Sequence, residues 1–380
     1  MIQLVCKKCK TTYSPDEPRW QCDCGHILDI RFKPGFPLEK IKGRKPNMWR
    51  YREAIPLDED VDIVSFAEGF TPLVEIEIAG QPVWVKQEQL FPSGSFKDRG
   101  ASVLVSKVKS LGIREVVVDS SGNAGSAMAA YCAAAGIKCN IFVPADTSPG
   151  KLAQIQLYGA HLNKIPGSRE DTANAVLKTA DTVYYASHYW NPFFFQGTKT
   201  FAFEICEQLG WKSPDTIILA VGNGSLLLGV YIGCCELRDA GIIDKIPRLI
   251  GVQTENCAPL VKAFKKNSGE IPGIRKKKTI AEGIAVATPI RGKQIIKAVQ
   301  ETGGELIAVG EEEIKQSLKE MCGKGYYIEP TSAAAIAGVK KYLRSHRSHQ
   351  QGAKPHEVIV SVFTGHGLKA GSKMLEYLKE

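Results

Sequence analysis

Lys97 is the residue of this sequence with the clearest chemical potential. It lies in the segment Ser-Phe-Lys-Asp-Arg-Gly at residues 95–100, and the apolar spacing of residues 97–108 predicts an amphipathic helix that begins near this lysine. The positive end of the helix dipole disfavours a second positive charge, so we expect the Lys97 amine to lose its proton readily and to attack an aldehyde. A polar turn, Ser-Ser-Gly-Asn at residues 120–123, follows further along the chain. This pairing suits covalent carbonyl chemistry.

A second segment, Gly-Asn-Gly-Ser at residues 222–225, has the composition of an anion-binding loop. It follows an apolar run and precedes a helix-like run at residues 226–237, so its amides and the helix N-terminus would form a phosphate cradle. A tight structural turn is the alternative interpretation. The lysine and Ser/Thr of a Walker loop are missing, and no Gly-x-Gly-x-x-Gly fingerprint occurs near a first strand, which argues against a nucleoside triphosphatase and a dinucleotide-binding enzyme.

A reactive lysine, a phosphate cradle and a further polar loop together meet the requirements of pyridoxal 5'-phosphate. The further loop is Thr-Gly-His-Gly at residues 364–367. The aldehyde of this cofactor binds a lysine, its phosphate binds amides, and its ring needs a polar partner. The sequence therefore indicates a pyridoxal-phosphate site.

The elements that would position these loops are short β-branched runs alternating with helix-like stretches. The predicted strands are residues 115–118, 138–143, 182–185, 216–220, 248–252, 306–309 and 357–362. Such alternation predicts parallel sheets covered on both faces, and ligands bind there at the carboxyl ends of the strands. Residues 120–124, 222–225 and 364–367 each follow a predicted strand.

We therefore expect an α/β fold with two open, mostly parallel, doubly wound sheet domains and the active site between them. Residues 31–98 and 196–380 are expected to form the large cofactor-binding domain, and residues 99–195 the smaller α/β domain. The proline-rich residues 31–85 are interpreted as a wrapping arm followed by an initial strand pair. A zinc-ribbon-like segment is expected at residues 1–30.

Four of the 11 cysteines are crowded into that first segment, at Cys6, Cys9, Cys22 and Cys24. Four thiolates can enclose one Zn²⁺ ion tetrahedrally, and about 30 residues bury too little surface to fold otherwise. We expect a structural zinc site with these ligands, with His26 as an alternative ligand. A site that has lost its metal and a set of free cysteines are the other interpretations.

Composition narrows the class of protein further. The chain has 380 residues, 44% hydrophobic and 23% charged, which fits roughly two to three globular domains. The longest near-apolar stretch, residues 124–137, is too short to span a bilayer, and the start of the chain lacks the pattern of a secretory signal, so we expect a cytoplasmic protein with no membrane partner. The net charge of +9 is dispersed, and the basic run at residues 275–278 is interpreted as a solvated loop. No nucleic-acid partner is expected.

Five motifs in the same order resemble threonine synthase, within the tryptophan-synthase-β-like class (fold type II) of pyridoxal-phosphate enzymes. They lie at residues 93–100, 121–123, 221–224, 329–335 and 364–369. The resemblance runs from about residue 68 to the C-terminus, and some relatives also carry an N-terminal cysteine ribbon. It implies a lyase of threonine biosynthesis that acts on a small amino-acid substrate and forms a homodimer.

The resemblance also implies a role for each site residue. Lys97 would bind the cofactor as a Schiff base and, once freed, act as the general base, while Asn123 would hydrogen-bond the ring hydroxyl. The cofactor phosphate would be bound by the amides of Gly222, Asn223, Gly224, Ser225 and Leu226. Thr364 would meet the ring nitrogen and, as a hydroxyl, leave the ring largely unprotonated. The substrate carboxylate would be received by Ser120, Ser121 and Ala124.

Two positions depart from the threonine synthase pattern and leave the substrate open. Many threonine synthases have a threonine where this chain has Ala124, and an arginine where it has Phe194. Both would help to hold the substrate phosphate, and an aromatic ring cannot replace a charge-assisted contact. Phe194 is interpreted either as part of a structural plug or as a substrate-facing wall, and Lys151 or Arg169 as a cation that could replace the arginine.

Four functions therefore stay open. The first is the conversion of O-phosphohomoserine and water to threonine and phosphate. The second is a serine/threonine ammonia-lyase, which residues 279–286 also resemble. The third is an O-phosphoserine-dependent sulfur-transfer synthase. The fourth, from a different class, is a zinc-ribbon regulatory or binding protein with a vestigial cofactor site.

Overall fold

The computed structural model describes residues 2–58, 63–147, 149–167, 169–267, 269–347, 357–371 and 374. The chain divides into two compact units. The first unit consists of residues 1–70 and 91–200, and the second of residues 71–90 and 201–380. The expected domain boundaries at residues 30, 98 and 195 stay a prediction.

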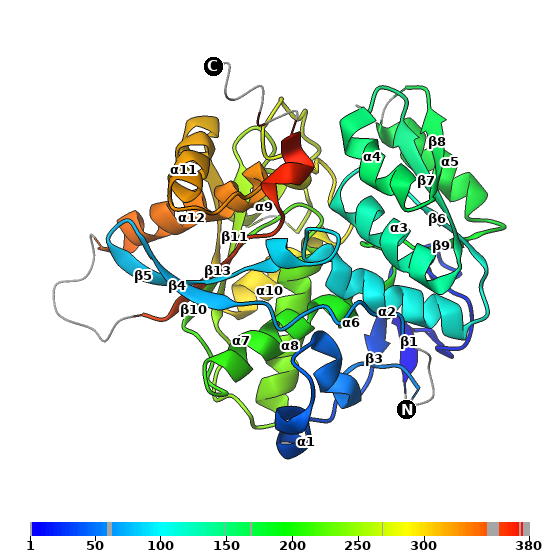
Figure 1. Ribbon diagram of the computed structural model, residues 1–380, viewed down its shortest axis with the longest axis horizontal. Helices are drawn as coiled ribbons and strands as arrows, with labels where there is room; N and C mark the ends of the chain where they lie inside the picture. Colours follow the sequence, from blue (N-terminus) through cyan, green and yellow to red (C-terminus); the bar gives the residue numbers. More distant parts are fainter. Residues whose placement is uncertain are drawn as a thin grey trace. The chain divides into compact units, whose positions relative to one another are not determined.

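The α/β part of the first unit is a four-stranded, all-parallel sheet in the order β8–β7–β6–β9. Its strands are β6 (Glu115–Val118), β7 (Lys138–Pro144), β8 (His161–Ile165) and β9 (Tyr184–Tyr185). Its helices are α2 (Lys97–Ser110), α3 (Asn123–Ala135), α4 (Pro149–Leu157), α5 (Arg169–Thr179) and α6 (Pro192–Thr198). Figure 1 shows the strands between α3 and α5, and both helices pack against β7. The three valines of β6 are buried because both faces of the sheet are covered.

The N-terminal residues of the first unit form a three-stranded antiparallel sheet in the order β2–β1–β3. It contains β1 (Gln3–Cys6), β2 (Thr12–Tyr13) and β3 (Leu28–Arg31). Trp20 packs edge-on against Tyr185 and Trp190, with ring centroids 5.0 and 5.4 Å away. The Lys107 ammonium of α2 lies 3.2 Å from the Asp16 carboxylate. These contacts attach the zinc-ribbon-like segment to the α/β part of the unit.

The chain between this sheet and α2 also packs into the first unit. Helix α1 (Leu38–Gly43) and a 3₁₀ segment (Met48–Ala54) follow the ribbon. The indole of Trp49 donates hydrogen bonds to the carboxylate of Glu68 and the hydroxyl of Ser102, at 3.1 and 3.0 Å. Because Ser102 lies on α2, this arm is attached to the helix that begins at Lys97.

The second unit contains a six-stranded sheet in the order β12–β11–β10–β13–β5–β4, parallel except for β4. Its strands are β4 (Leu73–Ile78), β5 (Gln81–Lys86), β10 (Thr216–Ala220), β11 (Arg248–Thr254), β12 (Glu305–Val309) and β13 (Ile359–Val362). Its helices are α7 (Thr200–Gln208), α8 (Ser225–Asp239), α9 (Pro259–Lys265), α10 (Gly292–Glu301), α11 (Glu311–Gly323) and α12 (Pro330–Arg347). Figure 1 shows α11 and α12 on one side of this sheet and α7 and α8 on the other.

The expected fold class, α/β with mostly parallel sheets, is confirmed. Among the described residues, no helix combines the length and apolarity needed to cross a lipid bilayer.

Candidate active site

Lys97 is the first residue of α2, as the sequence predicts. The amides of Asp98 and Arg99 in its first turn donate hydrogen bonds to the carbonyls of Ser95 and Phe96, at 3.3 and 3.2 Å. The Lys97 side chain is half-buried, and its ammonium nitrogen lies 4.3 Å from the centroid of the Phe96 ring. The Lys97 amine therefore lies beside an aromatic face near the helix start.

The residues after Lys97 fix the start of α2, from which the lysine side chain extends. The Asp98 carboxylate accepts hydrogen bonds from the amide and hydroxyl of Ser93, which closes the preceding turn. The Arg99 guanidinium donates to the Thr200 hydroxyl at 2.9 Å. Both Asp98 and Arg99 are fully buried, and buried charges with such partners hold a segment in one geometry. The motif is therefore a support for Lys97.

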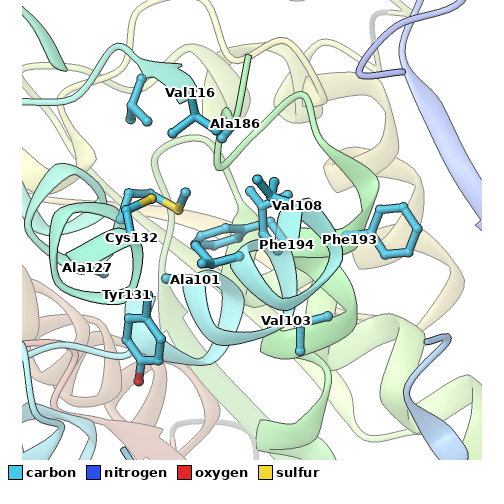
Figure 2. Close-up of a cluster of buried hydrophobic side chains, with 14 of the residues drawn as sticks. Ala101, Val103, Val108, Val116, Ala127, Tyr131, Cys132, Ala186, Phe193 and Phe194 are labelled. Carbon is cyan, nitrogen blue, oxygen red and sulfur yellow. The ribbon is translucent and has the colours of Figure 1, made fainter. Parts of the chain in front are cut away.

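Phe194 lies in the core of the first unit. Its side chain is 0% exposed, and a Cβ atom added to Gly100 would lie only 2.3 Å from its ring. Figure 2 shows the ring beside Ala101 of α2, while Phe193 points the other way. Gly197 makes the same kind of close approach, because an added Cβ atom would lie 1.9 Å from the carbonyl oxygen of Arg99. Two glycines thus let α6 pack directly on α2, and the structure supports the packing interpretation of Phe194.

The polar turn at residues 120–123 follows β6 and leads into α3, which begins at Asn123. Ser120, Ser121 and Asn123 are half-buried, and Ala124 is buried. An added Cβ atom at Gly125 would lie 1.9 Å from the Ser120 carbonyl oxygen, so only glycine lets the turn fold onto the helix. The first amides of a helix lack carbonyl partners one turn earlier, so the start of α3 is suited to a carboxylate.

Tyr189, which the sequence analysis does not single out, connects this turn to the neighbouring strand. β6 and β9 are parallel neighbours, so Asp119 after β6 and Tyr189 after β9 emerge at the same edge of the sheet. The Tyr189 hydroxyl donates to the Asp119 carboxylate and lies 3.1 Å from the Tyr185 hydroxyl. His188 packs edge-on against Tyr189 at 4.8 Å. A predicted strand end followed by polar residues was the signal available for this cluster.

The predicted phosphate cradle lies in the second unit, between β10 and α8. Gly224 caps the N-terminus of α8 with φ of +77°, a conformation that favours glycine, and an added Cβ atom would lie 2.3 Å from the Ile295 side chain. Gly222 also packs closely against backbone, because an added Cβ atom would lie 3.0 Å from the Gly283 carbonyl oxygen and 3.1 Å from the Cα atom of Ile284. These contacts leave the amides of the loop and of Ser225 and Leu226 as the surface that a phosphate would meet.

Thr364 emerges at the same sheet edge as this cradle, because β13 and β10 are parallel neighbours. Its hydroxyl donates to the Glu329 carboxylate at 2.8 Å and lies 3.0 Å from the Ser332 hydroxyl. An added Cβ atom at Gly283 would lie 2.6 Å from the Thr331 hydroxyl, so the segment beside Gly222 also reaches the start of α12. The structure therefore brings together the cradle and Thr364. Glu329 and Ser332 belong to a motif noted in the sequence, but residue type alone assigned them no role.

These residues fit pyridoxal phosphate. The second unit provides a glycine-limited cradle at a helix N-terminus and a buried hydroxyl beyond the neighbouring strand. The first unit provides a lysine at the start of α2 and a polar turn at the start of α3, and these two helices pack together. The side chains of Lys151 and Arg169 lie outside the described residues.

The four N-terminal cysteines also come together. Their sulfur atoms lie within 4.8 Å of one another, with Cys6 and Cys24 at 3.6 Å and Cys9 and Cys22 at 3.4 Å. A tetrahedral zinc with Zn–S bonds of about 2.3 Å separates its sulfurs by about 3.8 Å, so the cluster has nearly the required size.

The thiols of this cluster compete for negative charge. Hydrogen bonds from the Thr11 hydroxyl and amide lower the pKa of Cys9 to about 6, whereas the hydrogen bond with Cys22 raises the pKa of Cys24 to about 12. The pKa of Cys22 is lowered as well, although burial raises it, so Cys9 and Cys22 lose their protons more readily than Cys24. A dication at the centre would allow all four to ionise, so the donor set fits zinc.

Comparison with known proteins defines the class. A family model described as pyridoxal-phosphate dependent enzyme matches residues 64–365. The chain is 37% identical over 377 residues to threonine synthase from Methanocaldococcus jannaschii, covering 96% of this chain and 92% of that protein. It is 34% identical over 393 residues to threonine synthase from Methanosarcina acetivorans, covering 100% and 95%.

A solved structure agrees with the fold. The processed form of threonine deaminase isoform 2 from Solanum lycopersicum superposes with a TM-score of 0.71 at 21% identity, covering 93% of this chain and 92% of that one. This likeness concerns the fold alone. The chain belongs to the pyridoxal-phosphate dependent enzyme family. Within that family it is threonine synthase-like, since its similarity to threonine synthases runs through nearly its whole length.

Proposed function

We propose that the protein is a threonine synthase, which converts O-phosphohomoserine and water to threonine and phosphate. The similarity to threonine synthases along almost the full chain carries this proposal. The ammonia-lyase and sulfur-transfer alternatives are not favoured, because the curated relatives described above are threonine synthases and the deaminase resemblance concerns the fold. Membership of an enzyme family likewise disfavours a purely regulatory protein.

Each unit contributes different functions to the proposed reaction. The cofactor, when bound, supplies an electron sink for negative charge at the substrate Cα. The amides of residues 222–226 bind its phosphate, and Thr364 orients its ring. Lys97 would hold its aldehyde carbon, and the Nζ atom of the free amine would accept the Cα proton of the substrate.

The polar turn of the first unit orients the substrate. The hydroxyls of Ser120 and Ser121 and the amides at the start of α3 bind the substrate carboxylate, and Asn123 donates to the ring hydroxyl of the cofactor. The Lys97 amine would take up the Cα proton of a substrate held in this way and would return it later in the reaction.

Neither Phe194 nor Ala124 is a ligand for the leaving phosphate. Phe194 packs in the core against α2 and cannot bind a dianion, and Ala124 offers no hydroxyl. The proposal therefore requires that other groups of the chain bind the leaving phosphate. The substrate and its leaving group must be identified by assay.

A substrate panel tests the proposal. The cofactor-loaded protein is incubated separately with O-phosphohomoserine, threonine, serine and O-phosphoserine, and phosphate, threonine and 2-oxo acids are measured. We expect phosphate and threonine in equal amounts from O-phosphohomoserine alone. Formation of 2-oxobutyrate from threonine without phosphate release from O-phosphohomoserine would refute the proposal. K97A should abolish turnover, while K109A, an exposed lysine on the same helix, should retain it.

We also infer that Cys6, Cys9, Cys22 and Cys24 bind a structural zinc ion, which the spacing of their sulfur atoms supports. The expected homodimer and cytoplasmic location stay predictions.

A further inference from the structure

Thr364 is part of a buried hydrogen-bond chain in the second unit. Its hydroxyl donates to Glu329 Oε1 at 2.8 Å and lies 3.0 Å from the Ser332 hydroxyl. The Ser332 oxygen in turn accepts from the Gly365 amide at 3.2 Å. The three side chains are 2%, 7% and 0% exposed for Thr364, Glu329 and Ser332.

The number of hydroxyl protons fixes the direction of the hydrogen bonds that Thr364 makes. A hydroxyl has one proton and two lone pairs, and an ionised carboxylate only accepts. Because the Thr364 proton points to Glu329, Thr364 does not donate to Ser332, whose own proton goes either to the Thr364 oxygen or to the Gly365 carbonyl at 3.4 Å. At least one lone pair of the Thr364 oxygen then remains. Any further partner of Thr364 must therefore be a donor.

The surroundings favour the ionised form of Glu329. The residue directly precedes α12, and its carbonyl accepts the amides of Ser332 and Ala333 at 3.0 and 3.2 Å. Glu329 therefore lies at the start of an 18-residue helix, whose positive end favours a negative charge on a nearby side chain.

The backbone around Glu329 is shaped to hold this carboxylate. A Cβ atom added to Gly365 would lie 2.6 Å from the Glu329 carboxyl carbon, so only glycine allows the two segments to approach. The Glu329 amide donates to the Gly365 carbonyl at 2.9 Å, which ties the start of α12 to the Thr364 loop. The start of α12 and the Thr364 loop therefore together hold the Glu329 carboxylate against Thr364.

We propose that Glu329 is a positioning residue that turns the Thr364 hydroxyl so that it accepts from the cofactor ring nitrogen, which holds that nitrogen protonated. This proposal rests on the assignment of Thr364 to the ring nitrogen in the proposed function. A threonine hydroxyl without Glu329 would leave the ring nitrogen largely unprotonated, so Glu329 reverses the effect of Thr364. A protonated ring withdraws electrons more strongly, which suits a reaction whose leaving group is on the γ-carbon.

Nitrogen NMR of the loaded protein tests this directly. The protein is loaded with pyridoxal phosphate that carries ¹⁵N in its ring, and the resonance is compared with those of the free cofactor in acid and in alkali. We expect the wild-type signal at the protonated position. In E329Q the amide can donate to Thr364, so the Thr364 proton can turn to the ring, and we expect the signal at the unprotonated position.

E357Q is the matched control. Glu357 also accepts from a threonine hydroxyl, that of Thr216, but Thr216 begins β10 while the cradle follows its other end. The ¹⁵N signal of loaded E357Q should match that of the wild-type protein. A wild-type signal at the unprotonated position, or an unchanged signal in E329Q, would overturn the role of Glu329 and leave the cofactor assignment standing. An unprotonated wild-type signal would overturn the role of Glu329 even if E329Q does not load.

The failure of the proposed function has a different signature. If the wild-type protein shows no protein-bound ¹⁵N signal, the cofactor assignment and the role of Glu329 are both overturned. A bound, protonated signal that moves in E329Q, without threonine formation in the substrate panel, would support the role of Glu329 and refute threonine synthesis.

Discussion

In the second unit the candidate cofactor site is built mainly from backbone, whereas in the first unit it depends on packed side chains. The cradle at residues 222–226 is shaped by glycines whose missing Cβ atoms admit Ile295, Gly283 and Ile284. Lys97 instead stands on a helix whose start is fixed by buried Asp98 and Arg99 and whose flank is packed by Phe194. The cradle of the second unit should therefore be sensitive to added atoms. The surroundings of Lys97 in the first unit should be sensitive to removed side-chain atoms as well as to atoms added at Gly100, Gly125 or Gly197.

The zinc-ribbon-like segment gives the largest expected effect of removing atoms in the first unit. C9S removes one of four ligands, so we expect the purified variant to lose its single zinc ion and the ribbon to loosen around Trp20. Metal analysis and thermal unfolding measure both changes. C235S, which alters a half-buried cysteine of α8, should keep the metal. Equal zinc content in C9S and wild type would remove the zinc assignment.

Phe194 tests the packing of the first unit next. F194A should lower the free energy of unfolding by about 3–5 kcal/mol, the usual range for a fully buried phenylalanine. F66A, at a phenylalanine that is 47% exposed, should lower it much less. Chemical denaturation measures both. If F194A is as stable as wild type but changes which substrate is used, Phe194 is a substrate-facing wall.

Gly224 gives the corresponding test of the second unit, with the smallest expected effect on stability. G224A places a side chain at a φ of +77° and against Ile295, so we expect a loss of about 1–2 kcal/mol and weaker cofactor binding. G241A has a φ of +70° and open space, so it should show the backbone effect alone. Denaturation and cofactor titration compare them. Equal cofactor affinity in the two variants would contradict the cradle.

Local patterns predicted much of the fold. The helix beginning at Lys97, the loop before α8 and the strands β6, β7, β10 and β11 were predicted because apolar periodicity, glycine and β-branched runs act over a few residues. β8 was not predicted. Its sequence, His-Leu-Asn-Lys-Ile, is only half-buried at the edge of its sheet, so it carries little apolar signal.

Long-range contacts account for what the sequence could not predict about the site. The packing of Phe194 depends on Gly100, and the role of Glu329 depends on a threonine 35 residues away. The attachment of Trp49 to Ser102 likewise joins distant segments. Residue type alone does not distinguish these residues from others that have only a packing role. Their contacts can therefore be identified only in the folded structure.

Identification of the lysine that carries the cofactor tests the account most directly. The loaded protein is reduced with borohydride, digested, and its modified peptide identified by mass spectrometry. We predict a single pyridoxyl group on the Lys97 side chain, with none on Lys107 or Lys109 of the same helix. A pyridoxyl group on another lysine, or a loaded protein in which no lysine is modified, would contradict the assignment of Lys97.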